Sequence, residues 1–152
     1  MMRKVAFLPL IGLTIAACTN NTLIHSYKPL SADGWNRCDT ICFNIPQAEA
    51  DINGILTIGL RTIANIGMKD VVLAVEQCGE TASLCRCDTI SYSLTDSEGN
   101  ALGKGINIHQ FESVQLPFQM KKGHGCSVRI HHLMRREVIT DITEVGIKIA
   151  NL

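Results

Sequence analysis

In the run Asp88-Thr-Ile-Ser-Tyr-Ser-Leu94, polar and apolar side chains alternate without interruption from Thr89 onward. Successive side chains of an extended chain point to opposite faces, so Ile90, Tyr92 and Leu94 share one face and the hydroxyl residues take the other. A period of two over this length is typical of a half-buried β-strand. The run therefore predicts a strand with one buried face and one face in solvent.

Eight further runs share this pattern and are rich in Ile, Val, Leu and Thr: 23–27, 40–45, 55–63, 70–76, 103–111, 113–118, 127–134 and 144–150. Gly, Asn, Asp and Pro separate them, as expected of turns. Segments 47–53 and 135–143 could each form one helical turn, but neither carries an apolar stripe. Many short strands without crossover helices favour an antiparallel sandwich or open barrel. We predict an all-β fold, an antiparallel β-sandwich that is jelly-roll-like.

The N-terminus carries an export signal. Arg3 and Lys4 precede an apolar run at 5–15, and two alanines stand before Cys18. A run of this length is short for a resident membrane helix, and small residues at the cut site are typical of secretion. Ile15-Ala-Ala-Cys18 matches a bacterial lipobox, so we expect cleavage after residue 17, diacylglycerol on the Cys18 thiol and an acyl group such as palmitate on the new amino group. A plain secretory signal or a single anchoring helix is the alternative.

Three segments follow from this signal: a cleaved signal peptide (1–17), a lipid-anchored tether (18–22) and one β-sandwich domain (23–152). The expected membrane contact is the lipid on Cys18. Each buried CH₂ contributes about 0.8 kcal/mol, so several acyl chains make release from the membrane negligible. The full chain has 14 basic and 14 acidic residues, and loss of Arg3 and Lys4 leaves 12 − 14 = −2. This charge argues against nucleic acid as a partner, since phosphates require a basic surface.

Six cysteines remain after Cys18, and they are Cys38, Cys42, Cys78, Cys85, Cys87 and Cys126. An even number in an exported chain favours disulfides, although six cysteines allow 15 pairings. Cys78 is placed to pair with Cys85 or Cys87, because residues 79–83 have the composition of a turn. Cys38 and Cys42 would be too far apart for a mutual bond if both lay in one extended strand.

No metal site, cofactor or enzyme is predicted. His131 and His132 are adjacent, so in a strand they face opposite ways and cannot share an ion. Cys85-x-Cys87 lacks the two-residue spacing typical of zinc sites. There is no Gly-x-Ser-x-Gly nucleophile elbow, and Asp96 and Glu98 have the pattern of turn residues.

Four residues merit separate interpretation. Trp35 follows Asp33-Gly34, so its ring is either an exposed contact for a partner or sugar, or a cap tucked over the end of the sandwich; burial is favoured. Arg61 ends an apolar strand and needs a carboxylate or several carbonyl oxygens, and Asp39, Asp88 and Asp141 are the candidate carboxylates. Arg135 poses the same question, and we expect ion pairing for both. Gly103 could pack under an aromatic neighbour such as Trp35.

Several local patterns resemble the gliding-motility lipoprotein GldH family of the Bacteroidetes. They cover nearly all of the mature chain in order: Cys18, Tyr27, Trp35, 39–45, 60–62, 87–94, the turn 96–100, 102–105, Met134-Arg135 and 142–149. One departure lies at 63–68, where the family usually has an aromatic segment. It puts a shared binding surface at 63–70 in doubt.

The resemblance implies an envelope lipoprotein with a β-sandwich domain, named for a part in surface gliding, and it does not imply catalysis. We interpret the chain as an accessory or interaction module of a membrane-associated assembly, with envelope proteins as partners. The alternative is a carbohydrate-binding sandwich, which would need exposed aromatic rings. Thr19 and Asn20 do not form an acidic surface-export tag, which favours the outer membrane with the domain facing the periplasm.

Overall fold

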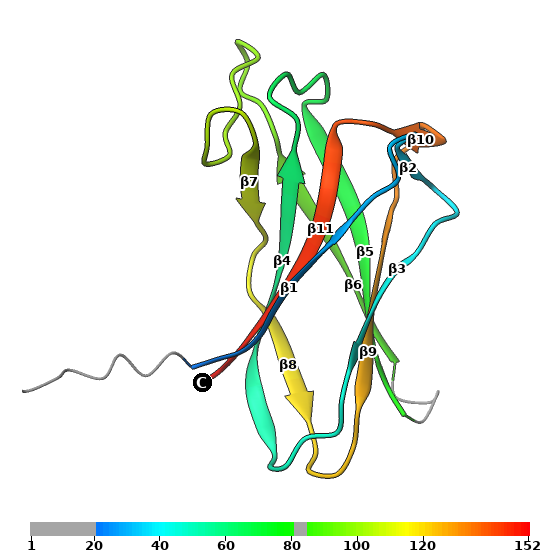
Figure 1. The fold of residues 1–152 in the computed structure, drawn as a ribbon, viewed down its shortest axis with the longest axis vertical. Helices are drawn as coiled ribbons and strands as arrows, with labels where there is room; N and C mark the ends of the chain where they lie inside the picture. The colour runs from blue at the N-terminus through cyan, green and yellow to red at the C-terminus, as the bar shows by residue number, and fades with distance from the viewer. Residues whose placement is uncertain (1–20, 81–84) are drawn as a thin grey trace, which may run out of the picture.

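The structure is a computed structural model that describes residues 21–80 and 85–152 (Figure 1). The predicted signal peptide, Cys18 and most of the tether lie outside these described residues. Two antiparallel sheets form the molecule. One contains β1 (Thr22–Pro29), β11 (Ile142–Asn151), β4 (Ile52–Thr62), β7 (His109–Glu112) and β8 (Leu116–Met120), and the other contains β3 (Ile41–Ile45), β9 (Cys126–His132), β5 (Asp70–Gly79) and β6 (Cys85–Ser93). A small third pairing joins β2 (Trp35–Asn36) to β10 (Val138–Ile139).

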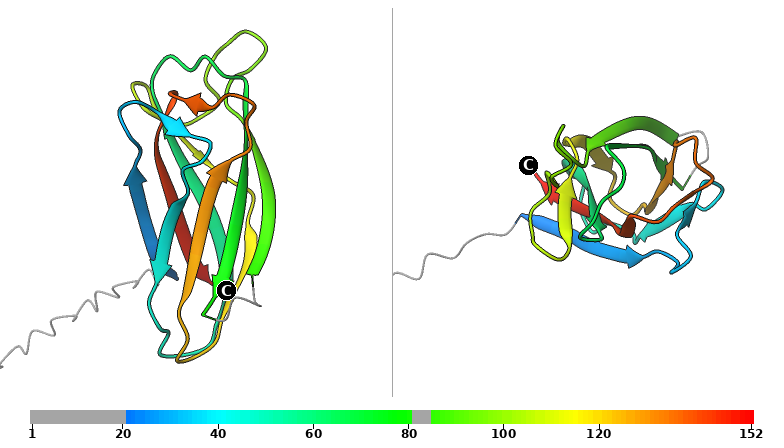
Figure 2. Two further views of the ribbon diagram at one scale, coloured as in Figure 1. Left: turned by 90° about the vertical axis from the view of Figure 1, so that its right-hand side faces the viewer. Right: turned by 90° about the horizontal axis from the view of Figure 1, so that it is seen from above.

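The long strands pair in a nested order. β1 pairs with β11, β3 with β9, β4 with both β7 and β8, and β5 with β6, all antiparallel. The order of pairing is that of one long hairpin that turns between β5 and β6. Successive strand pairs along this hairpin belong to different sheets. Nested pairs divided between two sheets are the jelly-roll arrangement. The predicted antiparallel, jelly-roll-like β-sandwich is confirmed, and Figure 2 shows the two layers enclosing the core.

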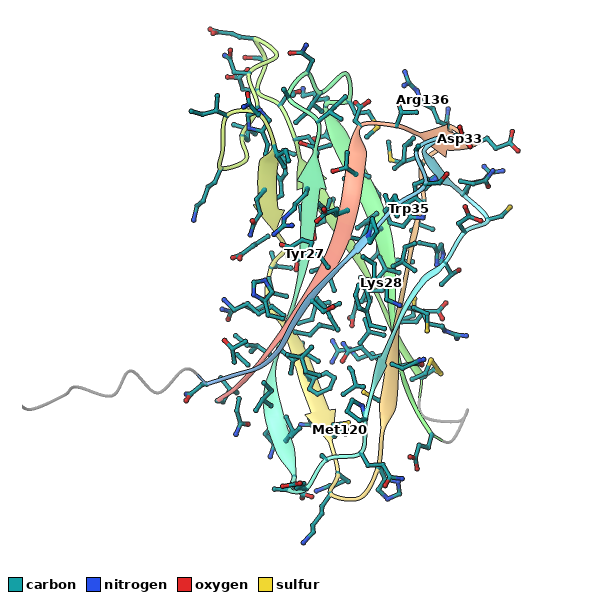
Figure 3. The ribbon with its side chains drawn as sticks, in the orientation of Figure 1. Tyr27, Lys28, Asp33, Trp35, Met120 and Arg136 are labelled. Atoms are coloured by element: carbon teal, nitrogen blue, oxygen red, sulfur yellow. A yellow bond between two sulfur atoms is a disulfide. The ribbon has the colours of Figure 1, made fainter. Side chains whose placement is uncertain are left out.

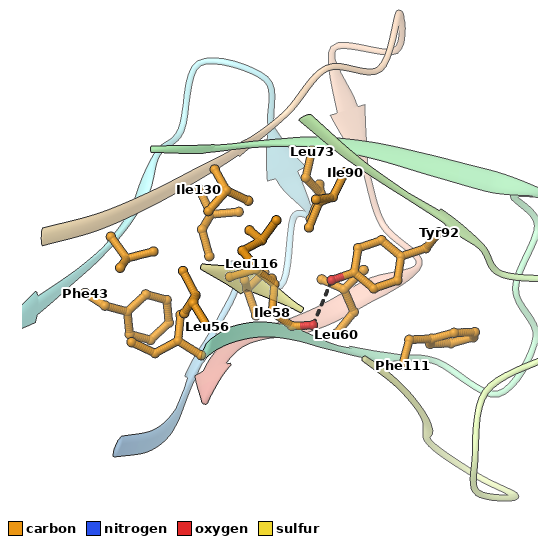
Figure 4. Close-up of a cluster of buried hydrophobic side chains, with 14 of the residues drawn as sticks. Phe43, Leu56, Ile58, Leu60, Leu73, Ile90, Tyr92, Phe111, Leu116 and Ile130 are labelled. Carbon is orange, nitrogen blue, oxygen red and sulfur yellow. Dashed lines mark hydrogen bonds between the residues drawn. The ribbon is translucent and has the colours of Figure 1, made fainter. Parts of the chain in front are cut away.

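The core forms where alternating side chains of the two sheets meet. From β4 come Leu56, Ile58 and Leu60, all 0% exposed, and the facing strands contribute residues such as Leu73 and Ile130. Figure 4 shows this cluster and the one hydrogen bond that crosses it, from the Tyr92 hydroxyl to the Ile58 carbonyl oxygen at 2.8 Å. Buried polar groups are costly unless they are paired, so this bond both satisfies the phenol and ties β6 to the opposite sheet.

Four sequence-based expectations need correction. Residues 103–108 are a turn rather than the start of a strand, because Gly105 has φ +123° and the chain reverses between Lys104 and Gln110. Segment 135–143 forms β10 rather than a helical turn, and 47–53 forms an isolated bridge at Ala48 followed by the start of β4. Gly103 does pack under an aromatic ring, but the ring is that of Phe111 and not Trp35, since a Cβ at Gly103 would lie 2.7 Å from the Phe111 ring.

The turn at 96–100 has the expected chemistry. The Asp96 carboxylate accepts hydrogen bonds from the amides of Glu98 and Asn100, at 2.9 and 2.8 Å. Gly99 has φ +88°, and this left-handed conformation closes the turn. Asp96 therefore serves the backbone, and these bonds, with the Asn100 side chain first, hold the pKa of its carboxyl below the usual value.

Trp35 seals one end of the sandwich. Its ring is 1% exposed, its indole N–H donates to the Asp39 carbonyl oxygen at 3.0 Å, and His132 packs edge-on against it at 5.4 Å between ring centroids. His132 is also fully buried, with Nε2 3.1 Å from the Trp35 carbonyl oxygen. The buried position excludes the exposed contact ring that was the other interpretation of Trp35.

The buried imidazole predicts an acid-sensitive fold. Burial lowers the pKa of His132 below its ordinary value of 6.5, so the folded state favours the neutral ring. Its contribution to stability is complete above pH 6.5 and is lost as the pH falls toward the lowered value, because the unfolded chain takes up the proton first. For the wild type, urea unfolding followed by Trp35 fluorescence should show that the free energy of unfolding declines between pH 7.5 and pH 5. This range brackets the ordinary histidine pKa of about 6.5, at which the unfolded chain takes up its proton.

His132→Gln supplies the comparison, since glutamine retains a donor for the Trp35 carbonyl but does not titrate. This variant should lose the part of the pH dependence that is due to His132. An unchanged pH dependence in His132→Gln would show that other groups cause the decline.

Candidate functional site

The outer face of the five-stranded sheet carries a tyrosine laid flat across two glycines. Tyr27 in β1 is paired with Gly146 in β11, which is paired with Gly59 in β4. A Cβ at Gly146 would lie 2.6 Å from carbons of the Tyr27 ring, and a Cβ at Gly59 would collide with its hydroxyl. Glycine inside a strand marks a place where another group approaches the backbone closely, and here that group is the phenol ring. Figure 3 shows Tyr27 on this face.

Arg61 lies over the Tyr27 ring and completes the surface. The guanidinium carbon is 4.1 Å from the ring centroid, and Nη1 is 2.7 Å from Oε2 of Glu144, its cross-strand neighbour. The two charged side chains are 37% and 33% exposed, so the pair is partly shielded from water. We call Tyr27, Gly59, Arg61, Glu144 and Gly146 the Tyr27 platform. Charge, ring and glycines together give a rigid surface with both donors and acceptors.

The partner of Arg61 corrects the sequence-based expectation. Asp88 instead binds Arg86, at 2.8 Å, and the Asp141 carboxylate accepts the amides of Gly67 and Met68. The third candidate, Asp39, takes part through its backbone carbonyl oxygen, which accepts a hydrogen bond from the Trp35 indole. Arg135 is exposed and makes no ion pair with any residue in the described part of the chain. The partner was missed because cross-strand neighbours depend on register, which alternation alone does not give.

The platform is suited to binding and not to bond making. Burial raises the pKa of Tyr27 above its ordinary value, although the Arg61 charge opposes the shift, so the phenol is protonated at neutral pH. The arginine is held by Glu144 and the ring. Around them the same face carries His25, Lys148 and Glu112, which add exposed or half-buried polar groups. Hydrogen bonds and ionic contacts are what this surface offers.

A pocket of about 520 Å³ lies at one end of the sandwich, where β4 and β8 face β5 and β9. Its carboxylates are already engaged. Glu80 accepts from the Gly125 amide at 3.0 Å and lies 3.2 Å from His124, and Asp51 accepts from Lys121 at 2.8 Å. The hydrogen bond from the Gly125 amide holds the pKa of the Glu80 carboxyl below its usual value. The hydrogen bond from Lys121 does the same for the pKa of the Asp51 carboxyl. Carboxyl groups with lowered pKa values are suited to holding a loop in place through hydrogen bonds, and not to general-acid chemistry, which needs a raised pKa.

The same pocket contains the half-buried thiol of Cys126. Burial raises the pKa of this thiol to about 11, so it is protonated at neutral pH. The thiolate is the nucleophilic form, and a raised pKa makes the group a poor nucleophile. Cys126 therefore behaves as a structural residue at the edge of the core.

Cys78 and Cys85 form a disulfide across the paired ends of β5 and β6. The other cysteines with described positions, Cys38, Cys42, Cys87 and Cys126, are unpaired, so the expectation of more disulfides is not met here. Geometry explains one case. Cys42 and Cys87 face outward in one row of the four-stranded sheet, but β9 and β5 lie between them. Three strand spacings of about 4.8 Å far exceed the reach of a disulfide.

Across residues 21–80 and 85–152, no group of three His, Cys, Asp or Glu side chains is placed to hold a metal ion. The described chain also contains no helix that is long and apolar enough to cross a membrane. Cys18 lies outside the described residues, so its lipidation stays a prediction.

The glycine contacts give a test of the Tyr27 platform. Gly146→Ala would push the Tyr27 ring off the sheet and break its contact with Arg61, which should lower the free energy of unfolding by about 1–3 kcal/mol, the usual cost of overpacking. Gly67→Ala is the matched control, because a Cβ there would lie 3.6 Å from the Asp141 carboxylate, an ordinary contact. Urea unfolding of both variants makes the comparison, and equal stabilities would show that the ring does not depend on the glycines.

Comparison with known proteins gives a family match and weak structural likeness. Residues 22–149 match the family model described as GldH lipoprotein. No curated protein matches the chain. A solved structure described as Eiger TNF from S. frugiperda has a TM-score of 0.32 and 11% sequence identity, and the match covers 70% of this chain and 62% of that chain. The present chain thus spans less than two thirds of that protein. The family model, in contrast, extends over most of the sequence, and the chain belongs to the GldH lipoprotein family.

Proposed function

We propose that this protein is a non-catalytic lipoprotein that serves as an interaction module of a membrane-associated assembly in the cell envelope. The observation that carries the proposal is the family match over residues 22–149, joined to a signal and lipobox that end at Cys18. Membership of a lipoprotein family implies anchoring through lipid. The sandwich would then be held at the membrane by Cys18 and present its surfaces to neighbours there.

Tethering is the proposed mechanism. A domain confined to a membrane surface meets other proteins of that surface at a high effective concentration, so weak contacts suffice for assembly. The Tyr27 platform supplies such a contact surface, since it offers a fixed arginine, a carboxylate and an aromatic ring. We place the domain at the outer membrane, facing the periplasm, because Thr19 and Asn20 do not form an acidic surface-export tag. The assembly is that of gliding motility in organisms that glide.

The chemistry of the described residues supports a non-catalytic role. Asp51 and Glu80 are clamped by other groups and the Cys126 thiol is protonated, so the pocket lacks an available acid or nucleophile among the groups considered. The GldH lipoprotein family is not a known enzyme family. Carbohydrate binding is less well supported, because Trp35 and Tyr92 are buried, at 1% and 5% exposure, and cannot stack on a sugar.

Lipid anchoring can be tested in cells grown with an alkynyl fatty acid. The wild-type protein should take up the label and stay with the membrane after a carbonate wash, because acyl chains and not protein contacts hold it. Cys18→Ser should lose both properties, while Cys38→Ser, which alters an exposed cysteine of the domain, should keep both. Label on Cys18→Ser, or none on the wild type, would contradict the proposed anchoring.

The interaction role can be tested by crosslinking in intact cells, with an affinity tag on the chain and mass spectrometry of the products. Arg61→Ala should lose envelope proteins that the wild type captures, because it removes the charge above Tyr27. Arg86→Ala is the matched control, since Arg86 is also ion-paired but lies on β6 of the other sheet. Identical partners for wild type and Arg61→Ala would place the contact elsewhere, and capture of bystanders alone by the wild type would count against the module itself.

A further inference from the structure

An exposed aliphatic rim borders the β7 side of the five-stranded sheet. We define the aliphatic rim as Leu102, Ile106, Ile108 and Val114, which are 55%, 87%, 57% and 70% exposed. The first three belong to the segment that leads into β7, and Val114 lies between β7 and β8. Single exposed aliphatic residues are common on protein surfaces, but several on neighbouring segments mark a place that another surface covers.

The turn that carries Ile106 is firmly built. Lys104 and Gln110 exchange two backbone hydrogen bonds, at 2.9 and 2.8 Å. Gly105 has φ +123°, and a Cβ there would collide with the Ile108 carbonyl oxygen. The exposure of Ile106 at the tip is therefore imposed by the backbone. Lys104 is the charged residue of the turn, and no acidic residue occurs between Glu98 and Glu112.

The rim lies on the side of the molecule from which the chain leads to Cys18. In Figure 1 the segment before β7 and the start of β1 both lie at the left-hand margin, one high and one low, and the view from above in Figure 2 also places both on the left. Four residue steps separate Cys18 from Thr22, and a fully extended chain spans at most about 3.6 Å per residue, or roughly 14 Å in all. Lipid on Cys18 would hold the leaflet within that reach of β1.

We propose that the aliphatic rim rests on the membrane leaflet that holds the acyl chains of Cys18, so that the sandwich lies along the membrane rather than standing away from it. This inference rests on the proposed lipid anchor. A flat surface placed against the left of Figure 1 meets the start of β1 and the turn before β7 together. Aliphatic side chains beside a lysine suit the boundary between acyl chains and headgroups, where apolar groups enter and the ammonium stays among the phosphates. The occupant is thus a lipid surface.

Limited trypsin digestion of the lipidated protein in vesicles of phosphatidylethanolamine and phosphatidylglycerol tests the contact. Lys104 lies in the proposed contact, whereas Arg136 is exposed at the opposite side of the view in Figure 3. The reference is Cys18→Ser protein in solution. Cleavage at Lys104 should slow by about tenfold or more on vesicles, since bound backbone is withheld from the protease, while cleavage at Arg136 changes little. Equal rates at Lys104 in the two forms would overturn the proposal.

Variants separate the lipid contact from other causes of protection. The double variant Ile106→Asp, Ile108→Asp should stay lipidated and regain rapid cleavage at Lys104, and Val138→Asp, which alters an exposed aliphatic residue near Arg136, should not. Near-native Trp35 fluorescence would show that each variant folds. Protection of Lys104 in cells but not in vesicles would assign the rim to a protein and overturn the lipid contact. Failure of the wild type to incorporate fatty acid would instead contradict the anchor, so the two failures are distinguishable.

Discussion

The rest of the structure depends on the alternation of β4. Its inward side chains Leu56, Ile58 and Leu60 are fully buried, while the outward positions include Gly59, beneath Tyr27, and Arg61, paired with Glu144. A one-residue slip would exchange the two faces, placing glycine in the core and leucines in water. β4 also pairs with three strands, β11, β7 and β8, so its register fixes theirs. Core and platform are therefore set by the same constraint.

Single side chains close the two long sides of the sandwich. On one side, Lys28 of the edge strand β1 donates to the Cys42 carbonyl oxygen of β3 at 2.6 Å and lies 5.3 Å from the centre of the Phe43 ring. On the other, Tyr92 reaches from β6 to Ile58. Sheet edges invite pairing with other chains, and a lysine on an edge strand is a common protection. These two links tie the two sheets together near their opposite edges.

Alternation made most of the fold predictable, because a half-buried strand leaves its period in the sequence; the runs that became β4, β5 and β6 were found in this way. The same rule could not find β2 and β10, which have two residues each and show no period. The same rule wrongly predicted that the strand which became β7 begins at residue 103. Residues 103–108 form a turn, but the exposed Ile106 and Ile108 give it the alternating polarity of a strand. Cross-strand partners are a matter of register, so Glu144 was missed as the partner of Arg61. Gly59 and Gly146 lie inside strand-like runs, and they are the sequence signal from which the close approach of another group could have been predicted.

The aliphatic rim borders the sheet that carries the Tyr27 platform, which limits the kind of partner that can use both. If the aliphatic rim rests on the leaflet, β7 lies next to the lipid. In the same sheet β4 is one strand spacing from β7, and β11 is two. At about 4.8 Å per strand, Arg61 and Glu144 are then within roughly 10 Å of the β7 edge. A protein that contacts the platform must reach that close to the membrane, which favours an integral or lipid-anchored protein over a freely diffusing one. Because lipid and platform would select such a partner jointly, neither contact has to be strong on its own.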